Sequence, residues 1–181
     1  QLDSFCSFDS VFGGHPESKN IPAIEFSTGS LGHGLPVAVG LAKASKLKNN
    51  NWRVLVLVGD GEINEGSNWE AAMHATKHKL DNLVVIVDYN DMQAFGKTHQ
   101  VVNMDSLVEK WSAFGFETVE INGHDLRSIR ESVMNVGKQG KPLCIIAYTV
   151  KGKGIKDAEH SPKWQDRKST RLNSSHANIS Y

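Results

Sequence analysis

A carboxylate follows one apolar run of this chain and an amide follows the next, and no other feature constrains the fold as much. Asp60 stands between two glycines directly after the apolar run 54–58, and Asn90 follows the second apolar run, 83–87. A helical pattern separates the two runs, so they predict neighbouring parallel strands joined by a crossover helix. The carboxyl ends of such strands meet at the edge where open α/β sheets bind ligands. The spacing therefore predicts a ligand site that contains Asp60 and Asn90.

The residue types at this edge suit a magnesium ion and a diphosphate. Mg²⁺ prefers oxygen ligands and often takes some of them from a substrate phosphate. Asp60 offers a carboxylate, Asn90 an amide oxygen, and Met92 a backbone carbonyl. Gly59 and Gly61 have no side chain to obstruct a phosphate, and free N–H groups at the start of the next helix would face that anion. On spacing alone, a Gly-Asp-Gly turn with an unrelated asparagine is an equally open interpretation.

Short runs rich in β-branched residues alternate with helical patterns along the chain. The runs cover residues 54–58, 83–87, 143–147 and, more weakly, 116–121. Continuous runs of this kind are typical of strands covered on both faces. Helical spacing links Trp69, Met73, Thr76 and Leu80, then Leu107, Trp111 and Phe114, then Leu126, Ile129, Val133 and Val136. Asp105 and Asp125 stand at expected N-cap positions. We therefore predict an α/β fold with a mostly parallel sheet and helices on both faces.

Composition excludes several classes of protein. The 181 residues carry 20 basic and 20 acidic side chains, which leaves no electrostatic argument for a nucleic-acid or membrane partner. No apolar run approaches the roughly 20 residues that span a bilayer, and no secretion leader opens the chain at Gln1. Cys6 and Cys144 are too far apart in sequence to suggest a disulfide framework or a zinc site. We expect a cytoplasmic protein.

The chain divides into one domain and a tail. Residues 1–165 carry the alternating pattern, whereas residues 166–181 are polar and have no periodicity. We predict that this tail is foreign or artefactual. A genuine disordered C-terminus is the alternative.

Several motifs together resemble those of the transketolase family. They are Gly14-His15-Pro16-Glu17, the glycine-rich loop 27–34, the stretch 59–66, Asp88-Tyr89-Asn90, Asn122-Gly123-His124-Asp125 and the stretch 149–154. The resemblance runs from about residue 5 to residue 164. It is strongest to the N-terminal subunit of split bacterial transketolases, which binds thiamine diphosphate.

The resemblance implies roles for particular residues. Asp60, Asn90 and the Met92 carbonyl would bind Mg²⁺, or Ca²⁺ or Mn²⁺ in its place. The thiamine diphosphate would contact Gly29, Ser30, Leu31, His33, Gly59 and Gly61. His15 would reach the donor sugar near its reacting carbons. Glu65 would lie at a dimer interface and link two active sites, although without the resemblance it is simply an acid favoured in the first turn of a helix.

The resemblance also implies that the chain works with a partner. The glutamate that activates the aminopyrimidine of the cofactor belongs to a pyrimidine-binding domain, which this chain lacks. A C-terminal transketolase subunit would supply it in a hetero-oligomer that moves a two-carbon ketol unit from a ketose phosphate to an aldose phosphate. Family histidines upstream of Gln1 and at Gln165 are missing, which indicates N-terminal truncation and a departure near the tail.

Two other functions stay open at this point. One is a different thiamine diphosphate enzyme subunit, of the deoxyxylulose phosphate synthase or 2-oxo acid dehydrogenase type. The other is a non-catalytic partner that binds magnesium and diphosphate.

A few remaining side chains suggest sites of their own. Glu70, His74 and His78 stand four apart and could chelate zinc, although a solvated row is the favoured interpretation. His124 is expected to stabilise a turn beside Asp125. Three tryptophans are expected to pack in the interior: Trp52, Trp69 and Trp111.

Overall fold

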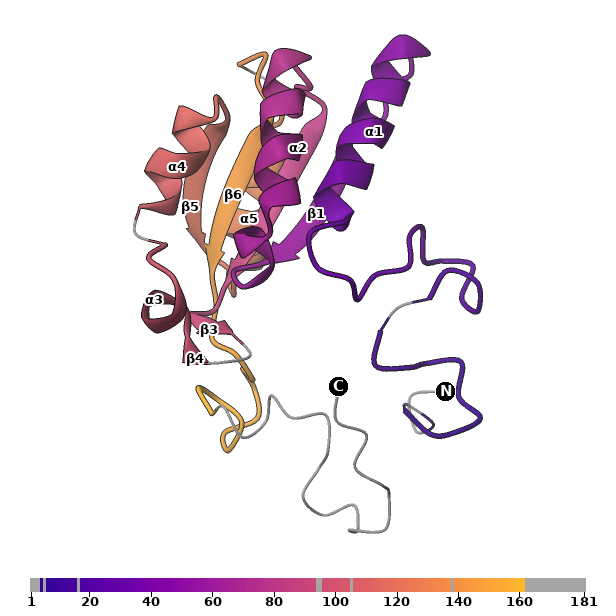
Figure 1. Cartoon of the computed structure of the whole chain (residues 1–181), viewed down its shortest axis with the longest axis vertical. Helices are drawn as coiled ribbons and strands as arrows, with labels where there is room; N and C mark the ends of the chain where they lie inside the picture. The colour runs from indigo at the N-terminus through magenta and orange to yellow at the C-terminus, as the bar shows by residue number, and fades with distance from the viewer. Residues whose placement is uncertain are drawn as a thin grey trace.

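The β-branched runs form a four-stranded parallel sheet in the order β1-β2-β6-β5 (Figure 1). The strands are β1 (Val54–Gly59), β2 (Leu83–Tyr89), β5 (Glu117–Asn122) and β6 (Leu143–Tyr148). The computed structural model describes residues 4, 6–15, 17–93, 96–104, 106–137 and 139–161. All four predicted strands are confirmed, with bounds that move by one or two residues.

The strand register brings the two predicted ligand segments to one edge. Gly59, the last residue of β1, pairs with Asp88 of β2, so the two strands end almost level. Asp60 and Asn90 follow directly after these ends. A short hairpin and helix complete this edge: β3 (Met92–Gln93), β4 (Gly96–Lys97) and α3 (Thr98–Val101).

Helices cover both faces of the sheet, as predicted. The larger core packs α1 (Gly34–Leu47), α2 (Gly66–Lys77) and α4 (Leu107–Ala113) against one face. A smaller core on the other face includes Val84, Leu143 and Ile145, with Val133 at the end of α5 (Leu126–Val133) packed against it. A one-turn 3₁₀ helix, η2 (Glu62–Asn64), joins β1 to α2.

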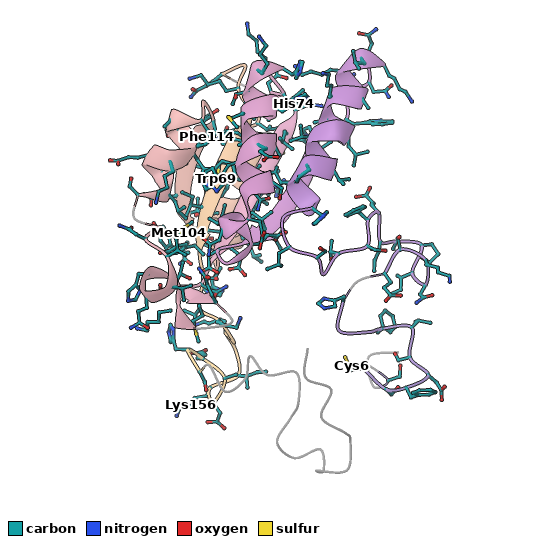
Figure 2. The ribbon with its side chains drawn as sticks, in the orientation of Figure 1. Cys6, Trp69, His74, Met104, Phe114 and Lys156 are labelled. Atoms are coloured by element: carbon teal, nitrogen blue, oxygen red, sulfur yellow. The ribbon has the colours of Figure 1, made fainter. Side chains whose placement is uncertain are left out.

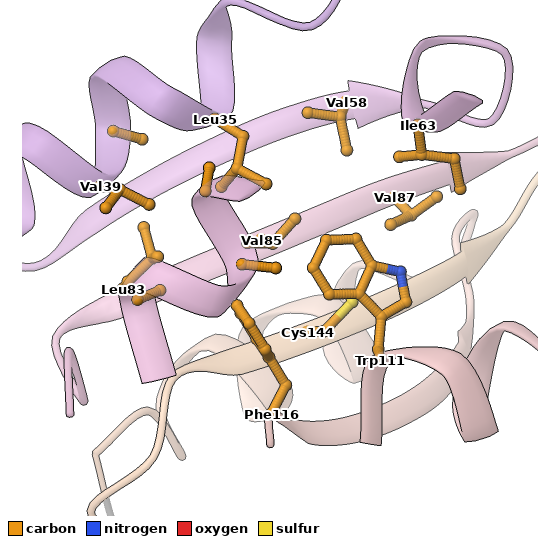
Figure 3. Close-up of a cluster of buried hydrophobic side chains, with 14 of the residues drawn as sticks. Leu35, Val39, Val58, Ile63, Leu83, Val85, Val87, Trp111, Phe116 and Cys144 are labelled. Atoms are coloured by element: carbon orange, nitrogen blue, oxygen red, sulfur yellow. The ribbon is translucent and has the colours of Figure 1, made fainter. Parts of the chain in front are cut away.

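Aromatic residues anchor α4 to the larger core (Figure 3). Trp111 is completely buried, with its ring centroid 5.1 Å from that of Trp69 and 5.0 Å from that of Phe116. Leu107 is also buried, so the predicted inner face of this helix is confirmed. Tilted and edge-on aromatic pairs of this kind add to the stabilisation from area burial.

The predicted inner face of α2 is wrong. Met73 is 55% exposed, whereas the buried apolar residues of this helix are alanines at positions 71, 72 and 75. These small side chains let α2 lie close to α1, which a methionine at the contact would prevent. Leu80 is buried, but it lies beyond the end of the helix.

The expectation that β1 is covered on both faces is also wrong. Leu55 and Leu57 point away from the larger core and are 49% and 69% exposed. The reason is position, because β1 lies at the edge of the sheet while α5 lies against β5. Trp52, just before β1, is 57% exposed and does not pack in the interior as predicted.

The capping prediction is confirmed at one helix and shifted at another. Asp125 caps α5, because its Oδ1 accepts a hydrogen bond of 3.0 Å from the Arg127 N–H. The N-cap of α4 is Ser106, whose Oγ accepts from the Glu109 N–H. The predicted cap, Asp105, lies outside the described residues.

Both cysteines are free thiols, with Cys144 buried and Cys6 exposed, so no disulfide forms between them. Within the described ranges, no helix combines the length and apolar character needed to cross a membrane. Gln165 and the predicted tail, 166–181, lie outside those ranges.

The loop after β6 depends on one glycine. Gly152 has a φ of 78°, and a Cβ atom there would lie 2.5 Å from the Ala158 carbonyl oxygen. Gly152→Ala should therefore lower the free energy of unfolding by about 2 kcal/mol, from the left-handed backbone and the clash together. Gly154→Ala is the control, because Gly154 has a φ of 94° but nothing within 4 Å of the added atom. Urea unfolding that shows equal losses for both variants would contradict the role of the clash.

Candidate functional site

Asp60 is buried at the carboxyl edge of the sheet, where the sequence predicts it. Its side chain accepts a hydrogen bond of 2.8 Å from the Gly61 N–H at Oδ1 and one of 2.8 Å from the Thr98 hydroxyl at Oδ2. Its own N–H donates to the Asp88 carbonyl across 3.2 Å. Only 2% of the residue is exposed. Such burial without a paired cation is costly for a carboxylate.

Burial raises the pKa of Asp60 above its usual value, and the nearby Asp88 carboxylate adds to the rise. Hydrogen bonds from Thr98, Gly61 and the Asp91 backbone oppose this shift. Because the folded-state pKa is raised, the unfolded chain releases this proton more easily than the folded one does. The resulting loss of stability grows as the pH rises from 3.8 through the folded-state pKa and stays constant above it. A divalent cation beside Asp60 would offset this penalty.

The second predicted ligand segment lies against Asp60. Asn90 begins a tight turn in which its Oδ1 accepts a hydrogen bond of 3.1 Å from the Met92 N–H. Asp91, the middle residue, has a left-handed φ of 57°, and its carbonyl accepts from the Thr98 N–H across 3.2 Å. Thr98 thus binds both Asp60 and this turn.

The donor set fits Mg²⁺. Asp60, Asn90 and Met92 bring a carboxylate, an amide oxygen and a backbone carbonyl to one edge, and such hard oxygen donors are the kind Mg²⁺ prefers. The described residues contain no cluster of three or more His, Cys, Asp or Glu side chains placed to hold a metal. A set with one carboxylate leaves room for ligands from a bound phosphate.

Thr98→Val should lower the free energy of unfolding at pH 7 by about 2 kcal/mol, because a buried carboxylate loses one of its donors. The pKa of Asp60 should rise further, since the Thr98 hydrogen bond lowers it. Thr98→Ser keeps the hydroxyl and is the matched control. Urea unfolding from pH 4 to pH 8 measures both effects, and the gap between the variants should widen as Asp60 ionises. Equal stability at pH 7 would contradict this role of Thr98.

The predicted cofactor loop lies beside His15. Gly29 has a φ of 130°, and a Cβ atom there would lie 3.0 Å from the Cγ of His15. Ser30 is exposed and Leu31 is 53% exposed. These four residues line one end of a cleft of about 1120 Å³ that continues along the outer side of β1. Asp60 and Asn90 lie outside the lining of that cleft.

His33 and the two glycines beside Asp60 have distinct surroundings. His33 is the N-cap residue of α1, with its Nδ1 3.0 Å from the Leu31 carbonyl. A Cβ atom on Gly59 would meet nothing within 4 Å, so a ligand can approach the backbone there. One on Gly61 would lie 3.3 Å from the Gln93 Cγ. Gln93 is 8% exposed, and its Nε2 has no hydrogen-bond partner.

Glu65 is the exposed N-cap residue of α2, so it precedes the helix and does not lie in its first turn. Its backbone is extended, and its side chain makes no capping hydrogen bond. Its Cβ lies 2.6 Å from where a Cβ on Gly32 would be, so it packs against the glycine-rich loop.

The remaining sequence candidates lie elsewhere. Figure 2 shows His74 on α2 at the end remote from the β3–β4 hairpin. Its ring stacks on that of His78, whose Nε2 lies 2.9 Å from the Lys43 ammonium nitrogen. The zinc hypothesis gains no third ligand here, given the absence of any such cluster in the described part of the chain. His124 stabilises a turn, because its Nε2 accepts a hydrogen bond of 2.8 Å from the Val150 N–H.

Comparison with known proteins points to the same kind of site. Residues 1–166 match the family model described as "Transketolase, thiamine diphosphate binding domain". The chain is 46% identical over 166 residues to one of the subunits of the apulose-4-phosphate transketolase of Actinobacillus succinogenes, which covers 92% of this chain and 60% of that protein. It is 37% identical over 159 residues to the SqwG subunit of the 6-deoxy-6-sulfo-D-fructose transketolase of Clostridium sp. (strain MSTE9), covering 87% and 58% respectively. The chain therefore spans less than two thirds of the length of either relative.

A solved structure shares the fold. The transketolase of Campylobacter jejuni superposes with a TM-score of 0.83 at 36% identity, over 90% of this chain and 26% of that one.

Proposed function

Since this chain belongs to the transketolase family, through that family's thiamine diphosphate-binding domain, we propose that it holds the diphosphate end of the cofactor in a two-chain transketolase. The enzyme would move a two-carbon ketol unit from a ketose phosphate to an aldose phosphate. The observation that carries the proposal is the buried Asp60 carboxylate held against the Asn90–Met92 turn at the carboxyl edge of the sheet.

Three oxygen donors would hold the metal, and backbone groups would hold the diphosphate. Asp60, Asn90 and the Met92 carbonyl would bind Mg²⁺, which would neutralise charge on the diphosphate. Gly59 and Gly61 leave the backbone open on either side of Asp60. Gly29, Ser30 and Leu31 would contact the cofactor from the loop before α1, with His33 beside them. The left-handed Gly29 lets that loop turn next to His15.

The bound cofactor supplies a nucleophilic carbon and an electron sink for breaking a carbon–carbon bond beside a ketone. This chain would orient it and provide polar groups around it. His15, at one end of the cleft, would hold or accept a proton from the hydroxyl groups of the donor sugar. Glu65, exposed before α2, would contact a neighbouring chain and couple two sites. Both assignments rest on the match to the family motifs.

A partner chain would complete the active site. The names of the two relatives describe them as subunits of transketolases. We propose that the partner carries the pyrimidine-binding and C-terminal domains, and with them the glutamate that activates the cofactor. The substrates are sugar phosphates or close analogues, as the different sugars in the relatives' names suggest.

Reconstitution tests this function. The chain is produced with a partner chain that carries a pyrimidine-binding domain, and two-carbon transfer is measured over a panel of ketose phosphate donors. We expect turnover only when both chains, thiamine diphosphate and Mg²⁺ are present. Calorimetry of cofactor binding to the same complex separates the possible failures. Cofactor binding without turnover on any donor would favour the non-catalytic alternative, and a complex that binds no cofactor would refute the proposal.

A further inference from the structure

The glutamate at the start of η2 connects two backbone segments that are far apart in sequence. Glu62 turns its side chain back towards the end of β1. Its Oε2 accepts a hydrogen bond of 3.3 Å from the Gly59 N–H, and its Oε1 accepts one of 3.1 Å from the Gly32 N–H. Thirty residues separate Glu62 from Gly32. Both carboxylate oxygens therefore bind main-chain donors, one on each segment.

The Gly32 peptide is held on its other sides as well. The Ser67 hydroxyl donates a hydrogen bond of 2.6 Å to the Gly32 carbonyl. A Cβ atom on Gly32 would lie 2.5 Å from the Ser67 Oγ and 2.6 Å from the Glu65 Cβ. The glycine-rich loop thus docks onto the segment that runs from η2 into α2, and Glu62 forms the charged part of this contact.

The backbone of Glu62 is fixed too. Its carbonyl accepts a hydrogen bond of 2.7 Å from the Nδ2 of Asn68, which is completely buried. The carboxylate therefore extends from an immobilised point in the protein. A rigid donor–acceptor arrangement of this kind transmits position from one segment to the other.

We infer that Glu62 is a positioning residue, which sets the glycine-rich loop at the correct distance from Gly59 and Asp60. This inference rests on the proposed function, because the two segments it joins are those proposed to hold the cofactor. Gly32 directly follows Gly29, Ser30 and Leu31, and Gly59 directly precedes Asp60. A shift of Gly32 would therefore move the loop contacts relative to the metal ligands.

Direct contact between Glu62 and the cofactor is disfavoured by charge. A carboxylate next to a diphosphate is repelled unless a cation lies between them. Glu62 also has both oxygens engaged with backbone N–H groups, and such charge-assisted hydrogen bonds are among the stronger ones in proteins. Its effect on the cofactor is therefore exerted through the loop.

Glu62→Gln separates this role from a merely structural one. Glutamine has a single acceptor oxygen, so one of the two N–H groups loses its partner. In the complex with the partner chain, at saturating Mg²⁺, we expect the dissociation constant of thiamine diphosphate to rise about tenfold, the equivalent of about 1.4 kcal/mol. At saturating cofactor, kcat and the KM for the sugar should stay at their original values.

A second readout does not depend on the cofactor. Amide hydrogen exchange in the cofactor-free complex should become faster at Gly32 and Gly59 in Glu62→Gln. Glu70→Gln, an exposed position on α2, is the matched control and should change neither readout. Glu62→Asp, whose shorter side chain cannot span both donors, replaces Glu62→Gln in both measurements if the latter does not fold.

Each outcome decides the inference. Unchanged exchange at Gly32 would overturn it, and so would faster exchange with unchanged cofactor affinity. Equal effects in Glu70→Gln would also overturn it. If the original complex binds no thiamine diphosphate, the proposed function fails, and exchange at Gly32 alone decides whether Glu62 holds the loop.

Discussion

Asp60→Asn should abolish magnesium-dependent binding of thiamine diphosphate and leave the metal-free fold at least as stable as before. The amide fits the existing contacts, because its oxygen can accept from the Gly61 N–H while its nitrogen donates to the Thr98 hydroxyl. It lacks the negative charge that a divalent cation needs. We expect the affinity for Mg²⁺ in the presence of cofactor to fall by at least about 100-fold, more than the usual loss of an outer-shell contact.

The stability of this variant should depend on pH in a defined direction. Burial raises the pKa of Asp60, so the original protein is penalised at every pH above that folded-state value. The asparagine carries no such penalty. At pH 7 and without metal, the free energy of unfolding of Asp60→Asn should therefore exceed that of the original protein by roughly 1 kcal/mol. The difference should shrink as the pH falls from the folded-state pKa of Asp60 towards 3.8.

Calorimetry and urea unfolding test the two halves separately. Asp157→Asn is the control, because Asp157 is exposed in the loop after β6. It should change neither metal binding nor stability. Retained Mg²⁺ affinity in Asp60→Asn would remove Asp60 from the metal site. A large loss of stability would show that its carboxylate is needed for the fold and not for an ion.

The strands could be predicted because their signal is local. Runs of β-branched residues bounded by turn residues need no distant partner to be recognised. Asp60 and Asn90 were predictable for the same reason, since each follows directly after a strand and parallel strands end together. The match between Gly59 and Asp88 in the sheet register is the physical basis of that success.

The residues that hold the site in place were not predictable. Thr98 lies 38 residues from Asp60 and Glu62 lies 30 residues from Gly32, and neither pair has a local pattern. Their hydrogen bonds exist only because the chain returns to the same edge of the sheet. A functional motif therefore indicates which groups meet the ligand, whereas the groups that orient them depend on tertiary structure.

The error at α2 has a different cause. Helical spacing connects Trp69 with Met73, but it equally connects Ala71, Ala72 and Ala75 on another side. Sequence reasoning favoured the larger apolar residues, although the close approach of α1 requires the smaller ones. Only the packing partner decides which side of such a helix is buried.

Gly32→Ala should disrupt both the loop and cofactor binding. Gly32 has a φ of 79°, which costs an alanine about 1–2 kcal/mol. The new methyl group would also meet the Ser67 Oγ at 2.5 Å and the Glu65 Cβ at 2.6 Å. We expect the free energy of unfolding to fall by about 3 kcal/mol, since strain and overpacking combine. The displaced loop should weaken thiamine diphosphate binding by more than about tenfold, the effect of 1.4 kcal/mol.

Gly34→Ala distinguishes this effect from a general intolerance of side chains in the loop. Gly34 is the first residue of α1, and a Cβ atom there would lie an ordinary 3.6 Å from the Val56 Cγ2. Alanine also favours a helix over glycine, by up to about 1 kcal/mol within its interior. The variant should therefore match or exceed the original stability and bind the cofactor normally. Calorimetry and thermal unfolding of both variants decide the point, because equal losses at positions 32 and 34 would mean that the left-handed, tightly docked Gly32 does not set the position of the loop.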